Sequence, residues 1–507
     1  MRPRRRSWRQ IAASVRQTEL FDAQGLDGDT RRSLYWVIWA VMVGQVCGFI
    51  TTGVVWTGYL RDVIRADDFA LGLITAAPVA ANTMQLLGAY LMQRWQKRRA
   101  FLLAGGLVAR FFWLPIALLP YLVPSLYHDA RMLLVSICVV AVAVGNSFVN
   151  VAWSSLMADI VPMRIRGNYF AARAGASMVI GLAGVLLASL LVDRMGQQGY
   201  TAALVLAGVT GMLDIACFFK VGFPPLEGPA GGVRPGFGKV LREVFADKHF
   251  MRVVYCFTCW SFAMNISAPF YNVHMLDNLR MGYTEITLLN QVTTNVATLL
   301  FVSRWGRPLD RFGGKAVVQL VSRVCMLSPL LWLFITRDTL WLMFIANALT
   351  GIFLPVIDLG QQNLYLEAAP KQNRAMSVAV FFAMTNLLGV ALSNTLGGYL
   401  LQTVYGAWAA GGAAAALGLN KYHFIFATSS ALRMLVVFAL FPLMREEGGT
   451  HYRKAAATML LEKRQGWGRF YHAVRASRLR LRYRAKLREE QADLDTAAGE
   501  PGSKDEQ

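Results

Sequence analysis

Long apolar runs are the feature that most constrains what this chain can fold into. About twelve runs of roughly twenty residues alternate with short polar segments, and twenty residues is the length a helix needs to cross a hydrocarbon core of about 30 Å. The chain is 55% hydrophobic and only 16% charged, which excludes an ordinary soluble globular domain. We therefore expect an all-α integral membrane protein. The expected spans are 33–60, 69–93, 100–123, 132–158, 168–192, 199–222, 251–276, 285–304, 316–336, 339–365, 374–403 and 421–444.

The formal net charge is +21, and the positive residues are distributed by side of the membrane. They do not form one basic module, so nucleic acid is not an expected partner. Basic residues concentrate before the first span and in alternate loops: Arg2, Arg4, Arg5, Arg6, Arg9, Arg16, Arg31, Arg32, Arg94, Lys97, Arg98, Arg99, Arg164, Arg166, Arg304, Arg307, Arg311 and Lys315. The opposite loops carry scattered charges such as Arg61, Arg131, Arg194 and Arg337. The positive-inside rule then places both termini in the cytoplasm and the chain in a cell inner or plasma membrane. The polar sequence after the first basic stretch does not indicate a cleaved signal peptide.

Cysteines and catalytic motifs give no sign of chemistry. Cys256 and Cys259 form a C-x-x-C pair inside an expected span, where we interpret them as packing residues because no second pair of ligands accompanies them. The sequence contains no Walker-type phosphate loop, H-E-x-x-H helix or G-x-S-x-G elbow. We expect no enzymatic activity, no cofactor and no metal site.

The chain repeats itself at an offset of a little over two hundred residues. D-I-V-P-M-R-I-R after the fourth span and E-A-A-P-K-Q-N-R after the tenth both place a proline three residues after an acid and an arginine four residues later. Three pairs of segments recur in the same order: 89–98 with 306–315, 107–110 with 320–323, and 159–166 with 367–374. Such repeats are typical of secondary transporters.

The repeat divides the chain into two halves with polar flanks. A basic segment within the tail, R-A-S-R-L-R-L-R-Y-R-A-K, would either lie on anionic headgroups or form a solvated charged helix. The expected domains are a basic cytoplasmic segment (1–32), a six-helix bundle (33–222), a cytoplasmic linker with an amphipathic helix (223–250), a second six-helix bundle (251–444) and a basic, partly disordered cytoplasmic tail (445–507).

The loop G-R-P-L-D-R-F-G-G-K between the eighth and ninth spans carries a resemblance. Together with twelve spans in two repeated halves, it resembles the major facilitator superfamily, whose loop signature it matches at Gly306, Asp310, Arg311, Gly313 and Lys315. The resemblance covers about residues 33–444 and implies a bacterial-type secondary transporter, with no subfamily assigned. The first-half copy departs from the signature, since it has Gln93 in place of the aspartate and Gln96 in place of a glycine.

The resemblance implies that spans one, four, seven and ten line a central cavity, with spans two, five, eight and eleven beside them. The candidate substrate-binding residues on these spans are Gln45, Thr52, Trp56, Asn146, Asn150, Trp153, Asn265, Tyr271, Asn272, Gln291, Asn295 and Gln361. Amides and aromatic rings suit a neutral polar solute such as a sugar, although any single amide more often makes a packing hydrogen bond between helices. The cavity spans contain almost no internal Lys or Arg, which argues against phosphate esters.

Ionisable residues inside the expected spans are functional candidates because each is costly to place in a bilayer. Arg110 and Asp214 lie at matched depths, so we expect a scaffold ion pair between them. Arg323 and Asp358 also lie at matched depths, and Asp358 is the first candidate for a coupling site, with a static ion pair as the alternative. Arg433, near the place where the sixth span carries Asp214, has no partner that the sequence identifies.

The signature loop and the repeated acidic and basic loops predict a cytoplasmic gate. In it, Asp310 and Arg311 would form a latch with Glu367 and Arg374. The full set of gate candidates is Gly306, Asp310, Arg311, Gly313, Lys315, Arg94, Asp159, Arg166, Glu367 and Arg374.

The leading functional hypothesis is a monomeric secondary active transporter that moves a small polar solute by alternating access, with protons or sodium as the coupling ion. Two alternatives remain open. One is a drug or metabolite exporter of the same fold, and the other is a membrane receptor or assembly factor that uses the scaffold without transporting.

Overall fold

The computed structural model describes residues 27–124, 126–162, 165–224, 237–370, 374–410, 416, 418–444 and 458. Within these residues, every regular element is a helix. Most of the expected N-terminal segment lies outside the described residues. The expected C-terminal tail also lies outside them, apart from Thr458.

The first half of the chain folds into six spans joined by short turns. They comprise α2 (Gly28–Thr52), α3 (Val54–Gly58) and η1 (Tyr59–Val63); α4 (Asp68–Ala81) and α5 (Met84–Trp95); α6 (Arg98–Phe111) and α7 (Trp113–Leu122); α8 (His128–Ile160); α9 (Arg166–Met195); and α10 (Gln197–Cys217) with η2 (Phe218–Lys220).

The second half begins with a short helix, α11 (Phe237–Ala246), which packs on α12 and α20 and lies in the expected linker. The six spans that follow comprise α12 (Lys248–Asn265) and α13 (Phe270–Asp277); α14 (Tyr283–Ile286), η3 (Thr287–Val292), α15 (Thr293–Phe301) and η4 (Val302–Arg304); α17 (Gly314–Cys325) and α18 (Ser328–Leu331), preceded by α16 (Gly306–Phe312); η5 (Arg337–Thr339) and α19 (Leu340–Ala368); α20 (Arg374–Met384), η7 (Thr385–Ala391), α21 (Leu392–Leu400), η8 (Leu401–Tyr405) and α22 (Gly406–Ala409); and α24 (Lys421–Leu435), η9 (Val436–Leu440) and η10 (Phe441–Leu443).

The expected count of about twelve spans is confirmed. Ten helices in the described residues are long and apolar enough to cross a membrane. The remaining two expected spans, the second and the eighth, are also helical. A turn interrupts the second, whereas the eighth is helical throughout from Tyr283 to Arg304 and includes the π-helical η3. In the second span, Pro78 lies near the end of α4, and the turn at Asn82 and Thr83 is closed by bonds three residues back, to Val79 and Ala80. These short turns separate α4 from α5 without ending the span.

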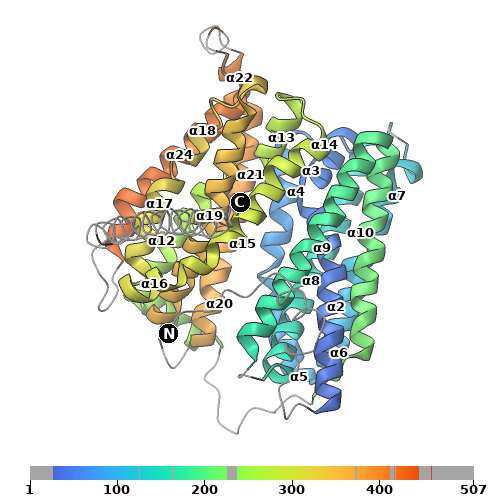
Figure 1. Cartoon of the computed structure of the whole chain (residues 1–507), viewed down its shortest axis with the longest axis vertical. Helices are drawn as coiled ribbons and strands as arrows, with labels where there is room; N and C mark the ends of the chain where they lie inside the picture. Colours follow the sequence, from blue (N-terminus) through green and yellow to red (C-terminus); the bar gives the residue numbers. More distant parts are fainter. Residues whose placement is uncertain are drawn as a thin grey trace, which may run out of the picture. The chain divides into compact units, whose positions relative to one another are not determined.

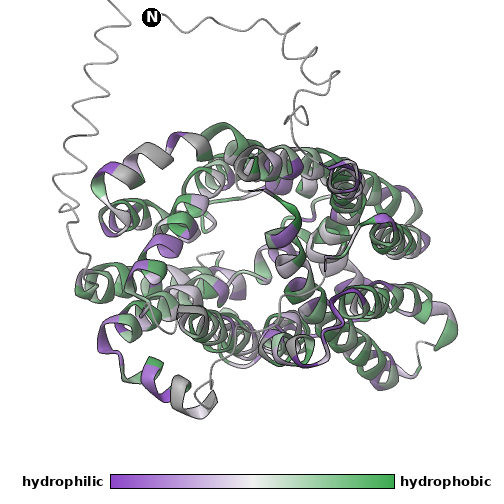
Figure 2. Cartoon of the chain, turned by 90° about the horizontal axis from the view of Figure 1, so that it is seen from below, coloured by the Kyte–Doolittle hydropathy of each residue, from purple (hydrophilic) through white to green (hydrophobic). Residues whose placement is uncertain are grey.

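We call the end at which α2 begins and η10 ends the proximal end, and the opposite end the distal end. Viewed from the proximal end, hydrophobic residues predominate along the helices (Figure 2). Large apolar side chains are exposed on several spans, for example Leu133 at 61%, Phe438 at 58% and Phe344 at 54%. Such extensive apolar exposure is unfavourable in water and suits a surface that faces lipid.

The six N-terminal spans form one bundle, the six C-terminal spans form another, and the two meet mainly in their distal halves. α4 packs on α21, η7 and η8, whereas α9 packs on α14 and η3 and α3 packs on α13 and α14. The proximal continuations of the same spans pack within their own bundles, α5 on α8 and α15 on α19. Figure 1 shows α3, α4, α13 and α14 gathered near the top, while α5 and α20 lie at the bottom in different bundles. The site is therefore built around an interface that is tight at one end.

Candidate functional site

A carboxylate at the distal end of the first span binds tyrosines from both bundles. Tyr200 of α10 donates a hydrogen bond to Asp62 Oδ2 at 2.5 Å, and Tyr283 of α14 donates to the same oxygen at 2.7 Å. The two phenol hydroxyls also contact each other. Because Tyr200 belongs to the N-terminal bundle and Tyr283 to the C-terminal bundle, Asp62 joins the bundles through charge-assisted hydrogen bonds.

Ion pairs across the interface lie beside this carboxylate. Arg61 Nη2 lies 2.9 Å from Asp277 Oδ2, and Arg61 Nη1 lies 3.5 Å from Asp68 Oδ1. Lys421 of α24 pairs with Asp68, whose side chain is only 6% exposed, and Tyr422 donates to Asp277 at 3.1 Å. A single exposed ion pair contributes at most about 1 kcal/mol. Here several charges alternate between the bundles, so the network is the relevant unit.

The end of α9 caps a helix of the opposite bundle. Asp193 accepts hydrogen bonds from the backbone N–H groups of Tyr283 and Thr284, each at 2.8 Å. These groups lie in the first turn of α14, where N–H groups have no partner within the helix. One layer below, the hydroxyls of Ser189 and Thr287 lie 2.7 Å apart. We refer to these interface residues as the distal polar network: Arg61, Asp62, Asp68, Ser189, Asp193, Tyr200, Asp277, Tyr283, Thr284, Thr287, Lys421 and Tyr422.

Glycines allow α4 and α21 to approach until their backbones touch. A Cβ atom on Gly72 would collide with the Asn394 carbonyl oxygen, and one on Gly398 would collide with the Asp68 carbonyl oxygen. Small residues at such positions let helices pack closely in membrane proteins. The distal interface is therefore closed by backbone contact as well as by polar side chains.

The proximal half of the interface instead contains a cavity of about 680 Å³. Its walls come from α5, α8 and the turn between α4 and α5 in the N-terminal bundle, and from α20 and η7 of the C-terminal bundle. Polar groups on these walls include Asn82, Gln85, Ser154 and Asn386, with Phe382 among them. The rest of the lining is mostly apolar and includes Val151 and Val378.

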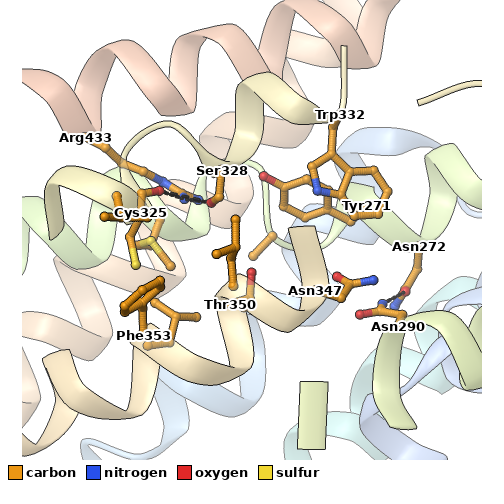
Figure 3. Close-up of a pocket in the computed structure, with 15 residues that line it drawn as sticks. Tyr271, Asn272, Asn290, Cys325, Ser328, Trp332, Asn347, Thr350, Phe353 and Arg433 are labelled. Carbon is orange, nitrogen blue, oxygen red and sulfur yellow. Dashed lines mark hydrogen bonds between the residues drawn. The ribbon is translucent and has the colours of Figure 1, made fainter. Parts of the chain in front are cut away.

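A second cavity of about 260 Å³ lies inside the C-terminal bundle, between spans seven, eight, nine, ten and twelve (Figure 3). Aromatic rings form one side of it: Tyr271 is stacked on Phe426 with centroids 4.4 Å apart, and Trp332 lies 4.8 Å from Tyr271. Asn347 and Thr350 contribute polar groups from α19. Such a lining of rings and a few polar groups is typical of a site for a small molecule.

A third cavity of about 180 Å³ connects the two bundles. Thr52 lines it from α2 and Gln291 from η3, and it shares Asn272 and Asn290 with the cavity inside the C-terminal bundle. Asn290 Nδ2 donates to Asn272 Oδ1, and Asn272 Nδ2 donates to Thr57 Oγ1, both at 3.4 Å. A polar strip therefore links the C-terminal cavity to the N-terminal bundle.

The structure places four of the candidate substrate residues, Thr52, Tyr271, Asn272 and Gln291, on the walls of these two cavities. Several other candidates make hydrogen bonds or contacts within one bundle. Asn265 and Asn295 each donate to the carbonyl four residues earlier, at 2.8 and 2.7 Å. Gln45 packs against Gly181 of α9.

The two candidate tryptophans lie away from the cavities described above. Trp56 is only 7% exposed because it stacks on Tyr59 and meets Trp113 edge-on, with ring centroids 5.1 Å apart. The structure therefore places Trp56 in the packed core of the N-terminal bundle and not, as expected, on a cavity wall. Arg173 of α9 lies over the Trp153 ring, 4.5 Å from its centroid.

Two further candidates, Asn150 and Gln361, line none of the three cavities. Asn150 is exposed on α8, and Gln361 is partly exposed on α19.

The expected scaffold ion pair between Arg110 and Asp214 is formed inside the N-terminal bundle. Arg110 Nη2 lies 3.4 Å from Asp214 Oδ2, and Arg110 Nη1 donates to Asn146 Oδ1 at 2.9 Å. The two charged side chains are 17% and 10% exposed. Asn146, a candidate for substrate binding, thus belongs to this internal network.

Arg323 and Asp358, both among the described residues, do not form the expected ion pair, and no hydrogen bond joins them. Arg323 donates through Nη1 to the Gln319 carbonyl, and its guanidinium lies over the Phe438 ring, 5.7 Å from the centroid. Asp358 is exposed on α19. Matched depth fixes position along the membrane normal but not the direction in which a helix presents a side chain, so it did not suffice to predict contact.

Several cytoplasmic gate candidates bind partners in their own bundle. Asp159 pairs with the buried Arg98, which also donates to Ser155 Oγ at 3.2 Å. Arg94 contacts the Tyr90 hydroxyl at 3.4 Å.

The signature loop is anchored in the C-terminal bundle. Lys315 contacts the carbonyls of Met444 and Pro442 at the end of the last span. Gly313 precedes α17 with a φ of 87°, a conformation that favours glycine. Arg311 is exposed and lies over the Phe312 ring, and Glu367 is exposed at the end of α19. The surroundings of Gly306 and the side chains of Asp310, Arg166 and Arg374 lie outside the described part, so the proposed latch remains a prediction.

Sequence reasoning missed the distal polar network. Its signal was present, because acids follow the first span at Asp62 and Asp68 and a base precedes the last span at Lys421. The position of Arg61 in the sequence indicates only a single charge in a loop. Charges of opposite sign in turns of the two halves that lie on the same side of the membrane would have indicated an interface.

The fold and the two-bundle site define a multi-pass membrane protein with an interface closed at one end. The chain matches the family model of the Major Facilitator Superfamily over residues 37–301 and 263–481, so it belongs to this superfamily. It is accordingly a membrane transporter of the major facilitator type. No curated protein sequence matches it significantly.

Solved structures share the fold at low sequence identity. The nucleoside transporter NupG has a TM-score of 0.62 at 12% identity, with 82% of this chain and 100% of that chain covered. The D-xylose-proton symporter has a TM-score of 0.62 at 16% identity, with the same coverage. A bacterial homologue of the human lysosomal transporter Spinster, in an inward-facing and unoccupied conformation, has a TM-score of 0.59 at 15% identity and covers 84% and 100%.

Proposed function

We propose that this protein is a secondary active transporter that moves a small polar solute, sugar-like in size and polarity, by alternating access. The observation that carries the proposal is the asymmetry of the interface. The distal polar network joins the bundles at one end, whereas a cavity of about 680 Å³ separates them at the other. Exchange between this arrangement and its opposite would expose a central solute to each side in turn.

The positive-inside rule supports placing the proximal end in the cytoplasm of a cell inner or plasma membrane. The structure then corresponds to a state closed to the outside and open toward the cytoplasm. Each chain holds both bundles and the cavities between and within them, so we propose that the monomer is the transporting unit.

The cavity linings support a small polar solute over a drug. The two cavities that carry the candidate residues, of about 260 and 180 Å³, are smaller than the roughly 300–1,000 Å³ of sites for drug-sized ligands, whereas the proximal cavity of about 680 Å³ lies within that range. The amides of Asn272, Asn290 and Gln291 face the rings of Tyr271 and Trp332 across these connected spaces. Amides bind hydroxyl groups, and rings cover the apolar face of a sugar-like molecule.

We propose Asp358 as the proton-coupling site, with sodium as the alternative ion. It is an acid within a membrane span, where a charge is costly and is kept for a functional reason. Its side chain is also exposed on α19.

Uptake into proteoliposomes tests transport and coupling together. We expect a pH gradient to drive accumulation of a labelled solute by the parent protein, and Asp358→Asn to allow only equilibration without accumulation. Asp338→Asn, which removes an acid from the distal turn before α19, is the matched control and should accumulate solute like the parent. If the pH gradient does not change solute flux in either the parent or Asp358→Asn, proton coupling is excluded. If flux depends instead on a sodium gradient, sodium is the coupling ion.

The solute itself is best found by a thermal-shift screen of the purified protein, because binding to the native state raises apparent stability. We expect stabilisation by sugars or related polar solutes. Stabilisation only by cationic drugs would favour the exporter, and binding without any flux in proteoliposomes would favour a receptor.

A further inference from the structure

Arg433 of α24 is a buried cation whose neighbours are neutral. The residue is 3% exposed, and its Nη1 donates to the Cys325 carbonyl at 3.1 Å and to Ser328 Oγ at 3.2 Å. Its Nε is buried and has no acceptor among the described residues. An arginine carries five N–H donors and a permanent charge, so these two acceptors and the neighbouring Tyr271 hydroxyl, all of them neutral, leave it incompletely satisfied.

The two bundles differ in how they balance charge at this depth. In the N-terminal bundle, Asp214 on the sixth span pairs with Arg110 on the third. In the C-terminal bundle, Arg433 on the sixth span also faces the third span, but there it binds a carbonyl and a hydroxyl and no carboxylate among the described residues. Asp358 is the one acid in the described middle parts of these six spans, and it forms no ion pair with Arg433. The charge of Arg433 is therefore not balanced by a carboxylate in the part of the bundle that the structure describes.

The unpaired cation lines a cavity. Arg433 forms part of the wall of the space of about 260 Å³ inside the C-terminal bundle, and Figure 3 shows its guanidinium turned toward Ser328 at the cavity edge. Tyr271 and Trp332 lie on the same cavity, with the amide of Asn347 from α19. A buried charge with an adjacent polar cavity is the arrangement that a bound anion would complete.

We propose that this cavity binds the carboxylate of a small hydroxylated monocarboxylate, such as a sugar acid, with Arg433 as the group that receives its negative charge. The rings of Tyr271 and Trp332 would cover the apolar face of the molecule, and amides would bind its hydroxyls. The inference rests on the proposed transport of a small polar solute and narrows that solute to one with a single negative charge. An inorganic monovalent anion such as chloride carries the same charge as the carboxylate, and the experiment distinguishes these two ligands.

The test compares a neutral and an anionic sugar of nearly the same shape. The full-length protein, purified in detergent and in a chloride-free buffer of constant ionic strength, is titrated with D-glucose, sodium D-glucuronate or sodium chloride while its thermal transition is followed. We expect glucuronate to raise the transition temperature and glucose to have little effect. We expect Arg433→Gln to weaken apparent glucuronate affinity by at least about tenfold, because a hydrogen bond to a charged group is lost.

Two variants control for charge and for folding. Arg433→Lys keeps the charge but not the planar fork, so it should retain part of the response. Arg337→Gln removes an exposed arginine that pairs with Glu285 on the surface of the same bundle, and it should respond like the parent. Equal stabilisation by glucose and glucuronate, or an unchanged response in Arg433→Gln, overturns the proposal. If chloride alone raises the transition temperature, the proposal of a bound carboxylate is overturned and Arg433 is assigned to binding an inorganic anion.

A second measurement on a chain with Arg433 intact covers the case in which the Arg433 variants do not fold. Iodide quenches the fluorescence of an indole that it reaches, and Trp332 lies on the cavity. We expect a quenched component that glucuronate protects in the parent and that Trp332→Phe lacks. Identical quenching curves in the two proteins would overturn the proposal. Because both measurements report binding, uptake of a neutral sugar in proteoliposomes with no anion binding would reject this inference and leave the proposed function standing.

Discussion

At the scale of single residues, burial determines which charges the protein must pair. Arg110 and Asp214 lie inside the N-terminal bundle with the amide of Asn146 between the third and fourth spans. Gly44 of α2 lies so close that a Cβ atom there would collide with the Asp214 carboxylate. The pair therefore lies among four helices, α2, α6, α8 and α10, and its side chains are only 17% and 10% exposed.

We expect Asp214→Leu to destabilise the protein by about 3–5 kcal/mol, the cost of leaving one partner of a buried pair unpaired. The double variant Arg110→Met with Asp214→Leu should recover most of this loss, because it removes both charges at similar volume. Thermal unfolding of the purified variants measures the difference. A double variant as unstable as Asp214→Leu would mean that packing at Gly44, not charge, sets the cost.

The same residues show what the sequence could predict. Arg110 and Asp214 could be matched because each is an isolated charge in an apolar run and their depths agree. Arg323 and Asp358 satisfied the same criterion without being brought together, since depth does not tell which way a helix turns a side chain. Trp56 is an aromatic residue on an expected cavity span, which made it a candidate. Only the packing of Trp113 against it shows that it is buried.

At the scale of elements, close helix contact sets how firmly the distal end is closed. α4 meets α21 at Gly72 and Gly398, where a side chain would strike the opposite backbone. The spans themselves were predictable because membrane thickness fixes their length. Their pairing was not, because apolar outer faces look alike in sequence and only small residues mark the contact.

We expect Gly398→Leu to separate α4 from α21 and to expose the cavity beneath the distal polar network. Overpacking costs about 1–3 kcal/mol, which corresponds to roughly a tenfold change in an equilibrium or more. Labelling of Val54→Cys, on the wall of the cavity of about 180 Å³, by a membrane-impermeant maleimide should rise accordingly in a background without native cysteines. Gly175→Leu is the matched control, because a Cβ atom at Gly175 meets nothing within 4 Å. Equal labelling rates in the two variants would show that this contact does not hold the distal end closed.

At the scale of the whole molecule, the two bundles can alternate only if the distal contacts break while the proximal cavity closes. Ser189 of α9 and Thr287 of η3 lie on opposite bundles with their hydroxyls 2.7 Å apart, which places them near enough for a disulfide once both are cysteine. This single bond would hold the distal end closed, and of the three cavities it borders the one of about 180 Å³, whose wall includes Thr287.

We expect oxidised Ser189→Cys with Thr287→Cys, in a background without native cysteines, to lose nearly all solute uptake and to regain it on reduction. The pair Thr336→Cys with Thr339→Cys joins two hydroxyls 3.0 Å apart within the C-terminal bundle, so its oxidation should leave uptake unchanged. Uptake into proteoliposomes before and after reduction, with the disulfide yield measured on each sample, provides the comparison. The oxidised cross-bundle pair should still bind solute from the proximal side, because its cavity stays open, and this separates a locked transporter from a misfolded one. Uptake at the parent rate with the disulfide fully formed would mean that the solute crosses without the distal end opening, and the alternating-access proposal would fail.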